Sequence, residues 1–384
     1  MSIFRPSWQA VLAIALCLLA LALPAMSSLE LEARANPTAT IDYPFIGTAG
    51  LIRMLLILGA AASMVRLSAV SEALILLVAA HAAAWLLLSG IAGYEGTALA
   101  PFFLLIAAGW LLAWRLVVVL SAIRPNRRAL DGLLRLAIPA IFGIWLLILW
   151  EAATRGFGIP FILLPPPSAI GVRIANSLSI LAADVRQTIF KAVLVGYVLG
   201  CASGFAVAIL ADRVVFLRRC LLPIGNMVSA LPIIGVAPIM VMWFGFDWQS
   251  KAAVVVIMTF FPMLVNTVTG LSASGSMERD LMRTYASSYW QTLFKLRLPA
   301  AAPFIFNALK INSTLALIGA IVAEFFGTPV VGMGFRISTE VGRMNIDMVW
   351  AEIAVAAVAG SVFYGLIALV ERAVTFWHPS VRGG

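Results

Sequence analysis

Long apolar runs, separated by short polar segments, dominate the hydrophobic pattern of this chain. An α-helix rises about 1.5 Å per residue, so about 20 apolar residues cross the roughly 30 Å hydrocarbon core of a bilayer. The runs are continuous and do not alternate, which indicates helices and not barrel strands. They predict about ten membrane-spanning helices, over residues 8–27, 47–65, 73–92, 99–122, 136–153, 189–211, 221–243, 252–272, 303–325 and 350–370.

The composition excludes a water-soluble fold. Hydrophobic residues make up 62% of the sequence and charged residues 11%, against roughly 45–50% and about 25% in soluble proteins. Polar side chains are therefore too few to cover a surface in water. The sequence predicts an all-α polytopic membrane protein.

The net charge of +9 does not indicate nucleic acid as a partner. The basic residues lie in short clusters between apolar runs, without a basic stripe, and this pattern is typical of loops beside anionic lipid headgroups. The more basic set of alternate loops, which includes residues 124–135 and 213–219, is expected on the cytoplasmic side. This assignment places both termini in the cytoplasm.

The start of the chain allows a second interpretation. Arg5, followed by an apolar run that ends near residues 23–27, could be a cleaved signal sequence, although Ala-x-Ala is absent. Cleavage would leave about nine spans. Further along, the polar, basic stretch 124–131 predicts a boundary between an accessory region with about four helices, residues 1–125, and a core with about six, residues 126–384.

The polar segment between the eighth and ninth predicted spans, residues 274–303, carries the clearest local pattern. Ser276 can cap a first short helix, and the spacing of Ser288 and Gln291 is that of a capping box for a second. Leu298-Pro299 is expected to close this second helix. One apolar stripe is expected on the two helices, formed by Met282, Ala286, Tyr289 and Leu293.

This segment resembles the coupling motif of binding-protein-dependent ABC importer permeases, in particular the nitrate, sulfonate and taurine branch. Asp280-Leu281-Met282 stands where the motif has Glu-Ala-Ala, Ala286 where it has glycine, and Leu298-Pro299 at its closing pair. Shorter matches to the branch are residues 164–168, 230–232, 323–327 and 376–379.

The loop also departs from the family pattern. Ala286 replaces a glycine that can turn through positive φ, a conformation that costs a residue with a Cβ atom about 1 kcal/mol. The acidic residue is Asp280 instead of Glu, and neither following residue is alanine. These departures imply either an altered docking geometry of the loop or a partner ATPase that is adapted to them.

The resemblance implies a type I importer permease core of six helices, with four extra helices before it, in a bacterial inner membrane. It implies a cytoplasmic ABC ATPase dimer, a periplasmic substrate-binding protein and a second permease copy as partners. The chain has no G-x-x-x-x-G-K-[ST] phosphate loop, so ATP and Mg are expected in the partner ATPase. We accordingly expect a transport subunit and not an enzyme, with no cofactor, catalytic residue or metal ligand of its own.

The resemblance assigns residues 278–297 to ATPase coupling. The named candidates there and at the closing pair are Glu278, Asp280, Leu281, Met282, Arg283, Tyr285, Ala286, Ser287, Tyr289, Trp290, Leu298 and Pro299.

Polar residues inside apolar windows are candidates to line a translocation path, with interhelical hydrogen bonding as the alternative. Glu324, near the end of its window, could instead reach water, act at a gate or contact a periplasmic segment. The candidates are Asn266, Asn307, Asn312, Ser313, Thr314 and Glu324.

The cargo expected from the resemblance is a small anion of the nitrate, sulfonate or taurine type, or a small heterocycle, moved by alternating access. An ATP-independent secondary carrier or channel is the alternative function. Gly196, Gly200 and Gly204 recur every four residues; this pattern favours close helix packing, with dimerisation as the other option.

Overall fold

Helices form the regular secondary structure of the computed structural model, which describes residues 7–21, 44–65, 67–124, 128–228, 232–327 and 330–377. The chain divides into two units, Met1–Gly171 and Val172–Gly384. The last predicted accessory helix and the first predicted core helix thus lie in the same unit. The residues considered for signal cleavage, 23–27, are outside the described ranges.

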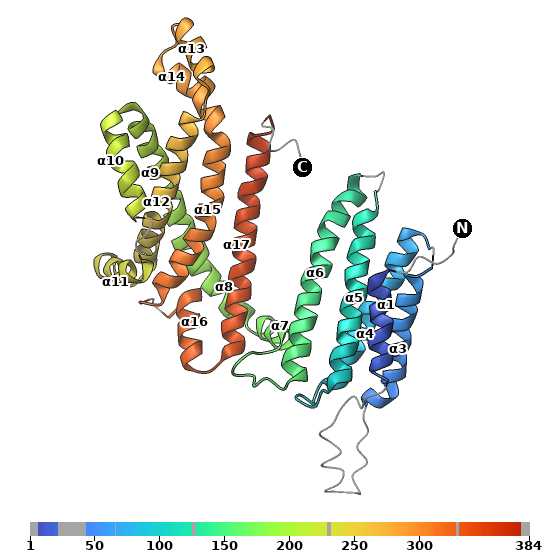
Figure 1. The fold of residues 1–384 in the computed structure, drawn as a ribbon. Helices are drawn as coiled ribbons and strands as arrows, with labels where there is room; N and C mark the ends of the chain where they lie inside the picture. The colour runs from blue at the N-terminus through green and yellow to red at the C-terminus, as the bar shows by residue number, and fades with distance from the viewer. Residues whose placement is uncertain are drawn as a thin grey trace. The chain divides into compact units, whose positions relative to one another are not determined.

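The first unit is a helical bundle in which α5 packs against α1, α4 and α6 (Figure 1). Its interior is mainly apolar, and among the described residues the largest fully buried side chain is Trp145 of α6. Trp145 lies against Gly109 of α5, where a Cβ atom would come within 2.9 Å of the indole ring. The helices are α1 (Trp8–Leu19), α3 (Pro44–Ala62), α4 (Ala69–Ile91), α5 (Ala100–Ala122) and α6 (Arg128–Gly156).

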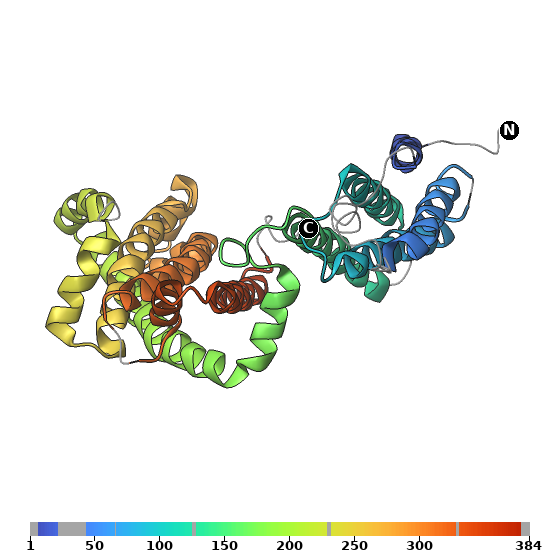
Figure 2. The same cartoon turned by 90° about the horizontal axis from the view of Figure 1, so that it is seen from below.

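The second unit is built around α12, which packs against α9 and α15. Figure 2 shows it from the end at which α16 lies. The elements, with the π-helical segments written η, are α7 (Pro167–Asn176, which begins in the first unit), α8 (Leu178–Val185), η1 (Arg186–Val193), α9 (Leu194–Arg213), α10 (Val215–Val228), α11 (Ile233–Phe244), α12 (Trp248–Ser272), α13 (Ser276–Thr284), α14 (Tyr289–Thr292), η2 (Leu293–Arg297), α15 (Leu298–Glu324), α16 (Met333–Gly342) and α17 (Ile346–Val374).

The glycine repeat of α9 faces α12. A Cβ atom on Gly196 would approach Ala252 O to 2.6 Å, and one on Gly204 would approach Phe260 O to 2.5 Å. At Gly200 it would overlap with Oγ1 of Thr259. The repeat therefore serves close packing of two helices within the chain, which is the first of the two predicted roles.

Apolar helices occupy every predicted window. Among the described residues, 7 helices are long and apolar enough to cross a membrane. Shorter apolar helices lie at Trp8–Leu19, Thr48–Ala62 and Ile233–Phe244. The predicted fold class, an all-α polytopic membrane protein, is confirmed. The window 221–243 holds two helices, because α10 ends at Val228 and α11 begins after its N-cap residue Pro232, whose backbone is extended.

Candidate functional site

Two short helices, α13 and α14, extend beyond the ends of α12 and α15 (Figure 1). The N–H of Gly275 donates to Glu278 Oε2 at 2.8 Å, so α13 is capped one residue before the predicted Ser276. The predicted capping box of α14 is confirmed: the N–H of Gln291 donates to Ser288 Oγ at 3.3 Å, and that of Ser288 to Gln291 Oε1 at 2.8 Å.

The chain reverses between these helices at Ala286, whose φ is 52°. The N–H groups of Ala286 and Ser287 donate to the carbonyls of Arg283 and Met282 at 2.9 and 3.0 Å. Bonds of this kind at a left-handed residue terminate a helix. The backbone thus adopts, with an alanine, the conformation for which the family pattern has glycine.

Asp212, the residue before the end of α9, anchors the loop to the helical bundle. Both terminal nitrogens of Arg297 donate to its carboxylate, at 2.6 and 2.7 Å, and the hydroxyl of Tyr289 donates to it at 3.0 Å. The Asp212 side chain is only 3% exposed. Arg297 also donates through Nε to the carbonyl of Leu271, at the end of α12, at 3.0 Å. One buried carboxylate therefore joins α9 to the loop, and Arg297 extends the connection to α12.

The predicted helix end at Leu298-Pro299 is wrong. A single apolar helical stretch runs from Tyr289 to Glu324, through α14, η2 and α15. Pro299 lies in the first turn of α15, directly after the π segment Leu293–Arg297. Such local adjustments can accommodate the backbone groups that a proline leaves without a partner.

The predicted stripe is also revised. Ala286 is exposed in the turn, and Leu293 is fully buried against Leu271 and Ala301. Met282 and Tyr289 are half-buried. We call the side chains that do face outward the exposed apolar set; it consists of Met277, Leu281, Tyr285, Trp290 and Phe294, which are 48–83% exposed.

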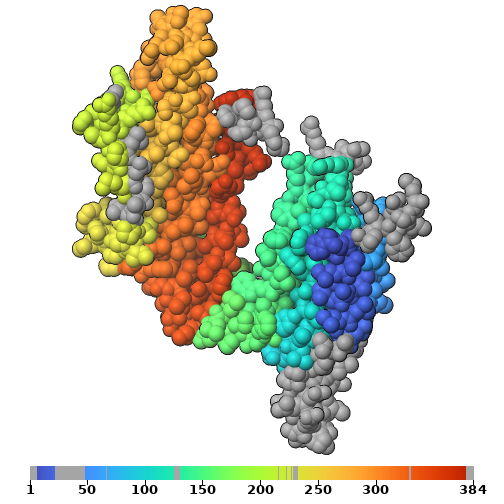
Figure 3. Space-filling view, viewed as in Figure 1, coloured from blue at the N-terminus to red at the C-terminus, as the bar shows by residue number. Residues whose placement is uncertain are grey.

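The exposed apolar set gives the loop a non-polar outer surface. Met277, Leu281 and Tyr285 follow each other at intervals of four residues and so lie on one side of α13. The rings of Trp290 and Phe294 stack with centroids 6.0 Å apart. The guanidinium of Arg213 lies 5.9 Å from the Trp290 ring centroid, within cation–π distance. Figure 3 shows that this part of the second unit stands out from its body.

The remaining predicted loop residues lie around these side chains. Glu278, Asp280 and Arg283 are exposed, and Arg283 donates to Asp280 at 3.3 Å. Ser287, Leu298 and Pro299 are half-buried.

The predicted path residues differ in their exposure. Asn312 and Ser313 are buried, and Asn312 Nδ2 donates to the Thr259 carbonyl at 2.8 Å, which is the interhelical bonding considered as the alternative. Asn266 is half-buried and donates to Pro262 O, at 2.8 Å, within its own helix.

Asn307 and Thr314 are exposed on α15. They alternate with three exposed apolar residues, Phe304, Ile311 and Ile318, at intervals of three and four residues. Such spacing places all five on one helix face. A polar amide on a face that met only lipid would be costly, so this face is the candidate to meet water or another protein.

Glu324, at the other end of α15, does not reach water. It is 1% exposed, accepts from Thr188 Oγ1 at 2.8 Å and accepts from the N–H of Gly334 at 2.7 Å. Asp184 similarly accepts from the N–H of Gly332 at 2.6 Å. Two buried carboxylates thus hold the N-terminus of α16, where acidic groups are favoured by the helix dipole.

Two charged side chains of the second unit, Arg336 and Asp247, have shifted pKa values. Burial lowers the pKa of Arg336, but its hydrogen bond to Asp184, at 2.9 Å, and the charge of that carboxylate raise it, and the net effect is a raised pKa. The N–H of Trp248, which donates at 2.7 Å, lowers the pKa of Asp247 at the start of α12. Both contacts stabilise the charged form of the side chain.

Sequence reasoning missed the residues that hold the loop and α16 in place, above all Asp212, Arg297 and Asp184. Their signal is weak, since each is one charged residue near the end of an apolar run. In the described ranges, no group of three or more His, Cys, Asp or Glu side chains is arranged to hold a metal ion.

These features define a class: a multi-pass helical membrane protein with a pair of surface helices anchored to its spans. The family model described as the inner membrane component of binding-protein-dependent transport systems matches residues 196–376.

Three relatives are similar to a longer part of the chain than the family model matches. The chain is 30% identical over 244 residues to the formylaminopyrimidine transport permease protein ThiX of Halalkalibacterium halodurans, covering 62% of this chain and 95% of the relative. It is 30% identical over 240 residues to the riboflavin transport system permease protein RibX of Chloroflexus aurantiacus, covering 61% and 88%. For the putative aliphatic sulfonates transport permease protein SsuC of Bacillus subtilis the values are 27% over 263 residues, with 68% and 93% covered.

The chain therefore belongs to the family of inner-membrane permeases of binding-protein-dependent ABC importers. It is a multi-pass transport protein of the inner membrane, as the resemblance in the loop predicted.

Proposed function

We propose that this chain is the transmembrane subunit of an ABC importer and moves a small solute by alternating access. A separate cytoplasmic ATPase dimer, which binds ATP and Mg, docks on the 278–297 loop. A periplasmic binding protein delivers the solute, and two copies of this chain enclose the path.

The observation that carries the coupling proposal is the exposed apolar set on an anchored loop. Apolar surface gains roughly 25 cal/mol per Å² when it leaves water, so a cluster of such side chains on a protruding loop favours a protein partner. The loop is also held firmly, because the Arg297 and Tyr289 side chains bind the buried carboxylate of Asp212. A partner that binds this surface can therefore move the attached helices and not only the loop.

The α15 face with Asn307 and Thr314 supports a path between two copies. These two polar side chains lie among exposed apolar ones, and pairing with the same face of a second copy would remove them from lipid. The exposed apolar side chains of α17, among them Val358 and Val362, would face lipid.

The cargo proposed is a small heterocycle or a small anion. Two relatives that are 30% identical over 95% and 88% of their length are named for formylaminopyrimidine and riboflavin transport, and others are named for aliphatic sulfonates and taurine. In the proposed orientation, both termini and the loop are cytoplasmic and α16 is periplasmic. The basic loops support this orientation.

The experiment is to change Leu281 to Asp in the full-length chain, co-expressed with the ATPase of the same transport system. A carboxylate in the exposed apolar set would have to lose its water on docking. We expect the ATPase to be lost from affinity-purified Leu281→Asp permease and solute uptake by cells to fall at least about tenfold, the effect of roughly 1.4 kcal/mol.

Ser276→Asp is the matched control. It adds the same charge to the same helix, at the first position of α13, where an acidic group is favoured by the helix dipole. Full ATPase recovery and uptake with Leu281→Asp would refute the docking proposal. Accumulation of solute by liposomes that contain this chain and no ATPase would favour the alternative carrier or channel.

A further inference from the structure

An apolar groove lies in the first unit between α4 and α6. Its volume is about 420 Å³, within the range of about 300–1,000 Å³ typical of small-molecule sites. Most of its lining is apolar, from Trp85, Leu88, Ala92, Ile144, Leu147 and Ile148. Both helices are long enough to span a membrane, so an aliphatic chain is the natural occupant of the groove.

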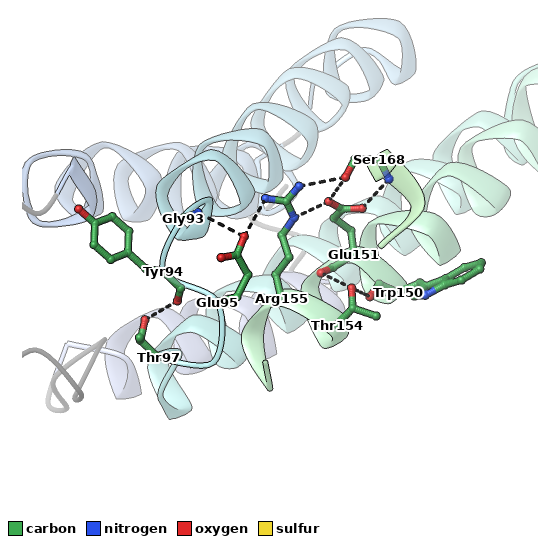
Figure 4. A network of polar contacts seen from close by, with 9 residues as sticks. All are labelled: Gly93, Tyr94, Glu95, Thr97, Trp150, Glu151, Thr154, Arg155 and Ser168. Carbon is green, nitrogen blue, oxygen red and sulfur yellow. Dashed lines mark hydrogen bonds and ion pairs between the residues drawn. The ribbon is translucent and has the colours of Figure 1, made fainter. Parts of the chain in front are cut away.

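One end of the groove is polar, and Figure 4 shows the contacts there. Arg155 donates through Nε to Glu151 Oε1 at 2.5 Å and through a terminal nitrogen to Ser168 Oγ at 2.9 Å. Its other terminal nitrogen lies 3.6 Å from Glu95 Oε1. Glu151 also accepts from the N–H of Ser168 at 2.9 Å. The spans of α4 and α6 end at Ile91 and Gly156, so this polar end lies at a membrane boundary.

The polar end has an excess of negative charge. Two carboxylates, Glu95 and Glu151, face one guanidinium, and the C-termini of α4 and α6, which are the negative ends of their dipoles, lie beside them. The Glu95 side chain is 49% exposed and can receive a cation from outside. A guanidinium has five N–H donors, and the contacts described for Arg155 use three of them. The end of the groove can thus bind an ammonium group and a phosphate side by side.

We propose that this groove binds a membrane phospholipid with an ammonium headgroup, of the phosphatidylethanolamine type. One acyl chain lies along the apolar lining, the phosphate accepts from Arg155, and the ammonium donates to Glu95. A phosphatidylglycerol headgroup has the phosphate but lacks the ammonium, so the excess of carboxylates disfavours it. The site connects α6, the helix that begins the predicted permease core, to the preceding helices through a lipid.

The test uses the full-length chain, purified and delipidated in detergent. Native mass spectrometry is carried out with equimolar phosphatidylethanolamine and phosphatidylglycerol that have the same acyl chains. We expect the ethanolamine lipid to be bound preferentially. Ser89→Trp, which fills the groove from α4, should remove this bound lipid. Glu95→Gln should lower the preference by about threefold, the size of one interfacial ion pair.

Ser121→Trp is the matched control for Ser89→Trp. Both serines are exposed near a helix C-terminus, and both donate to the carbonyl three residues earlier, at 3.1 Å and 2.8 Å. Ser121→Trp should leave lipid binding unchanged. Equal binding of the two lipids by the unaltered chain, or full retention of the ethanolamine lipid by both Ser89→Trp and Glu95→Gln, would overturn the proposal. Because Glu95→Gln alters a half-exposed side chain, it provides a test even if Ser89→Trp does not fold.

Discussion

At the scale of single residues, Ala286 shows how a side chain can conflict with its backbone. Its φ of 52° lies in the left-handed region, which costs a residue with a Cβ atom roughly 1–2 kcal/mol. Hydrogen bonds from Ala286 and Ser287 to the preceding turn hold this conformation. The loop therefore keeps the shape expected of a glycine at some cost in stability.

Ala286→Gly should stabilise the loop by about 1 kcal/mol, because glycine adopts this φ without strain. The measurement is hydrogen exchange of the backbone amides of residues 285–288, which should slow by about fivefold. Ala300→Gly, in the first turn of α15, should instead lower stability, because glycine weakens a helix. Faster exchange in Ala286→Gly would contradict the strain argument.

The pair of Asp212 and Arg297 should be far more important for stability than an exposed pair. Arg297→Ala would leave the carboxylate of Asp212, 3% exposed, without its charged partner, at a cost of about 3–5 kcal/mol. The double variant Asp212→Ala with Arg297→Ala should recover part of this loss. Thermal unfolding of the four chains of this cycle in detergent measures the coupling.

Arg283→Ala is the control for that cycle. Its partner Asp280 and Arg283 itself are 68% and 83% exposed, so the change should cost less than about 1 kcal/mol. Equal effects of Arg297→Ala and Arg283→Ala would show that Asp212 does not anchor the loop.

At the scale of helices, the contact of α9 with α12 depends on the glycine repeat. Gly200→Ala would place a methyl group on Oγ1 of Thr259 and 2.9 Å from Val256 O. A backbone oxygen cannot move aside as the end of a flexible side chain can. We therefore expect the free energy of unfolding to fall by about 1–3 kcal/mol, with a lower unfolding temperature. Gly365→Ala in α17, where a Cβ atom would meet nothing within 4 Å, should be neutral or slightly stabilising. A neutral Gly200→Ala would contradict the packing.

Among the described residues, seven of the ten predicted windows hold helices long and apolar enough to cross a bilayer, and the other three hold shorter apolar helices. The seven were predictable because the length of an apolar run decides whether it can cross. The break between α10 and α11 was less clear, since Pro232 and Pro238 are both compatible with a kinked helix. The continuation of α14 into α15 was missed, because Leu298-Pro299 normally indicates a helix end and the π segment before it has no sequence signature that we recognise.

The site was predictable only where its residues are close in sequence. The capping box of Ser288 and Gln291 follows from local spacing. The left-handed position of Ala286 follows from the resemblance to the family motif, which has glycine there. Asp212 is 77 residues from Tyr289 and 85 from Arg297, so only the folded chain shows that they meet. The same is true of Asp184 and Arg336, which are 152 residues apart.

At the scale of the whole molecule, the packing of α6 decides where the chain can be cut without loss of stability. The predicted boundary is between residues 125 and 126, but α6 packs against α5 and α4, and Trp145 is fully buried there. Deletion of residues 1–125 should therefore remove the packing partners of α6 and lower the unfolding temperature by several degrees.

Thermal unfolding and solute uptake of the shortened chain measure this effect, with Trp145→Ala in the full chain as the comparison. We expect Trp145→Ala to reproduce part of the loss, since it removes a large buried side chain. Unchanged stability of the shortened chain would show that residues 126–384 fold independently of the preceding helices.

The helical stretch from Tyr289 to Glu324 has 36 residues and is about 54 Å long. Its first residue is bound to Asp212, and its last carboxylate holds the N-terminus of α16. When one end of a continuous helix is displaced, its other end tilts or shifts with it. If the ATPase docks on the loop as we propose, its movement would therefore be carried to the far end of α15 by one continuous helical stretch.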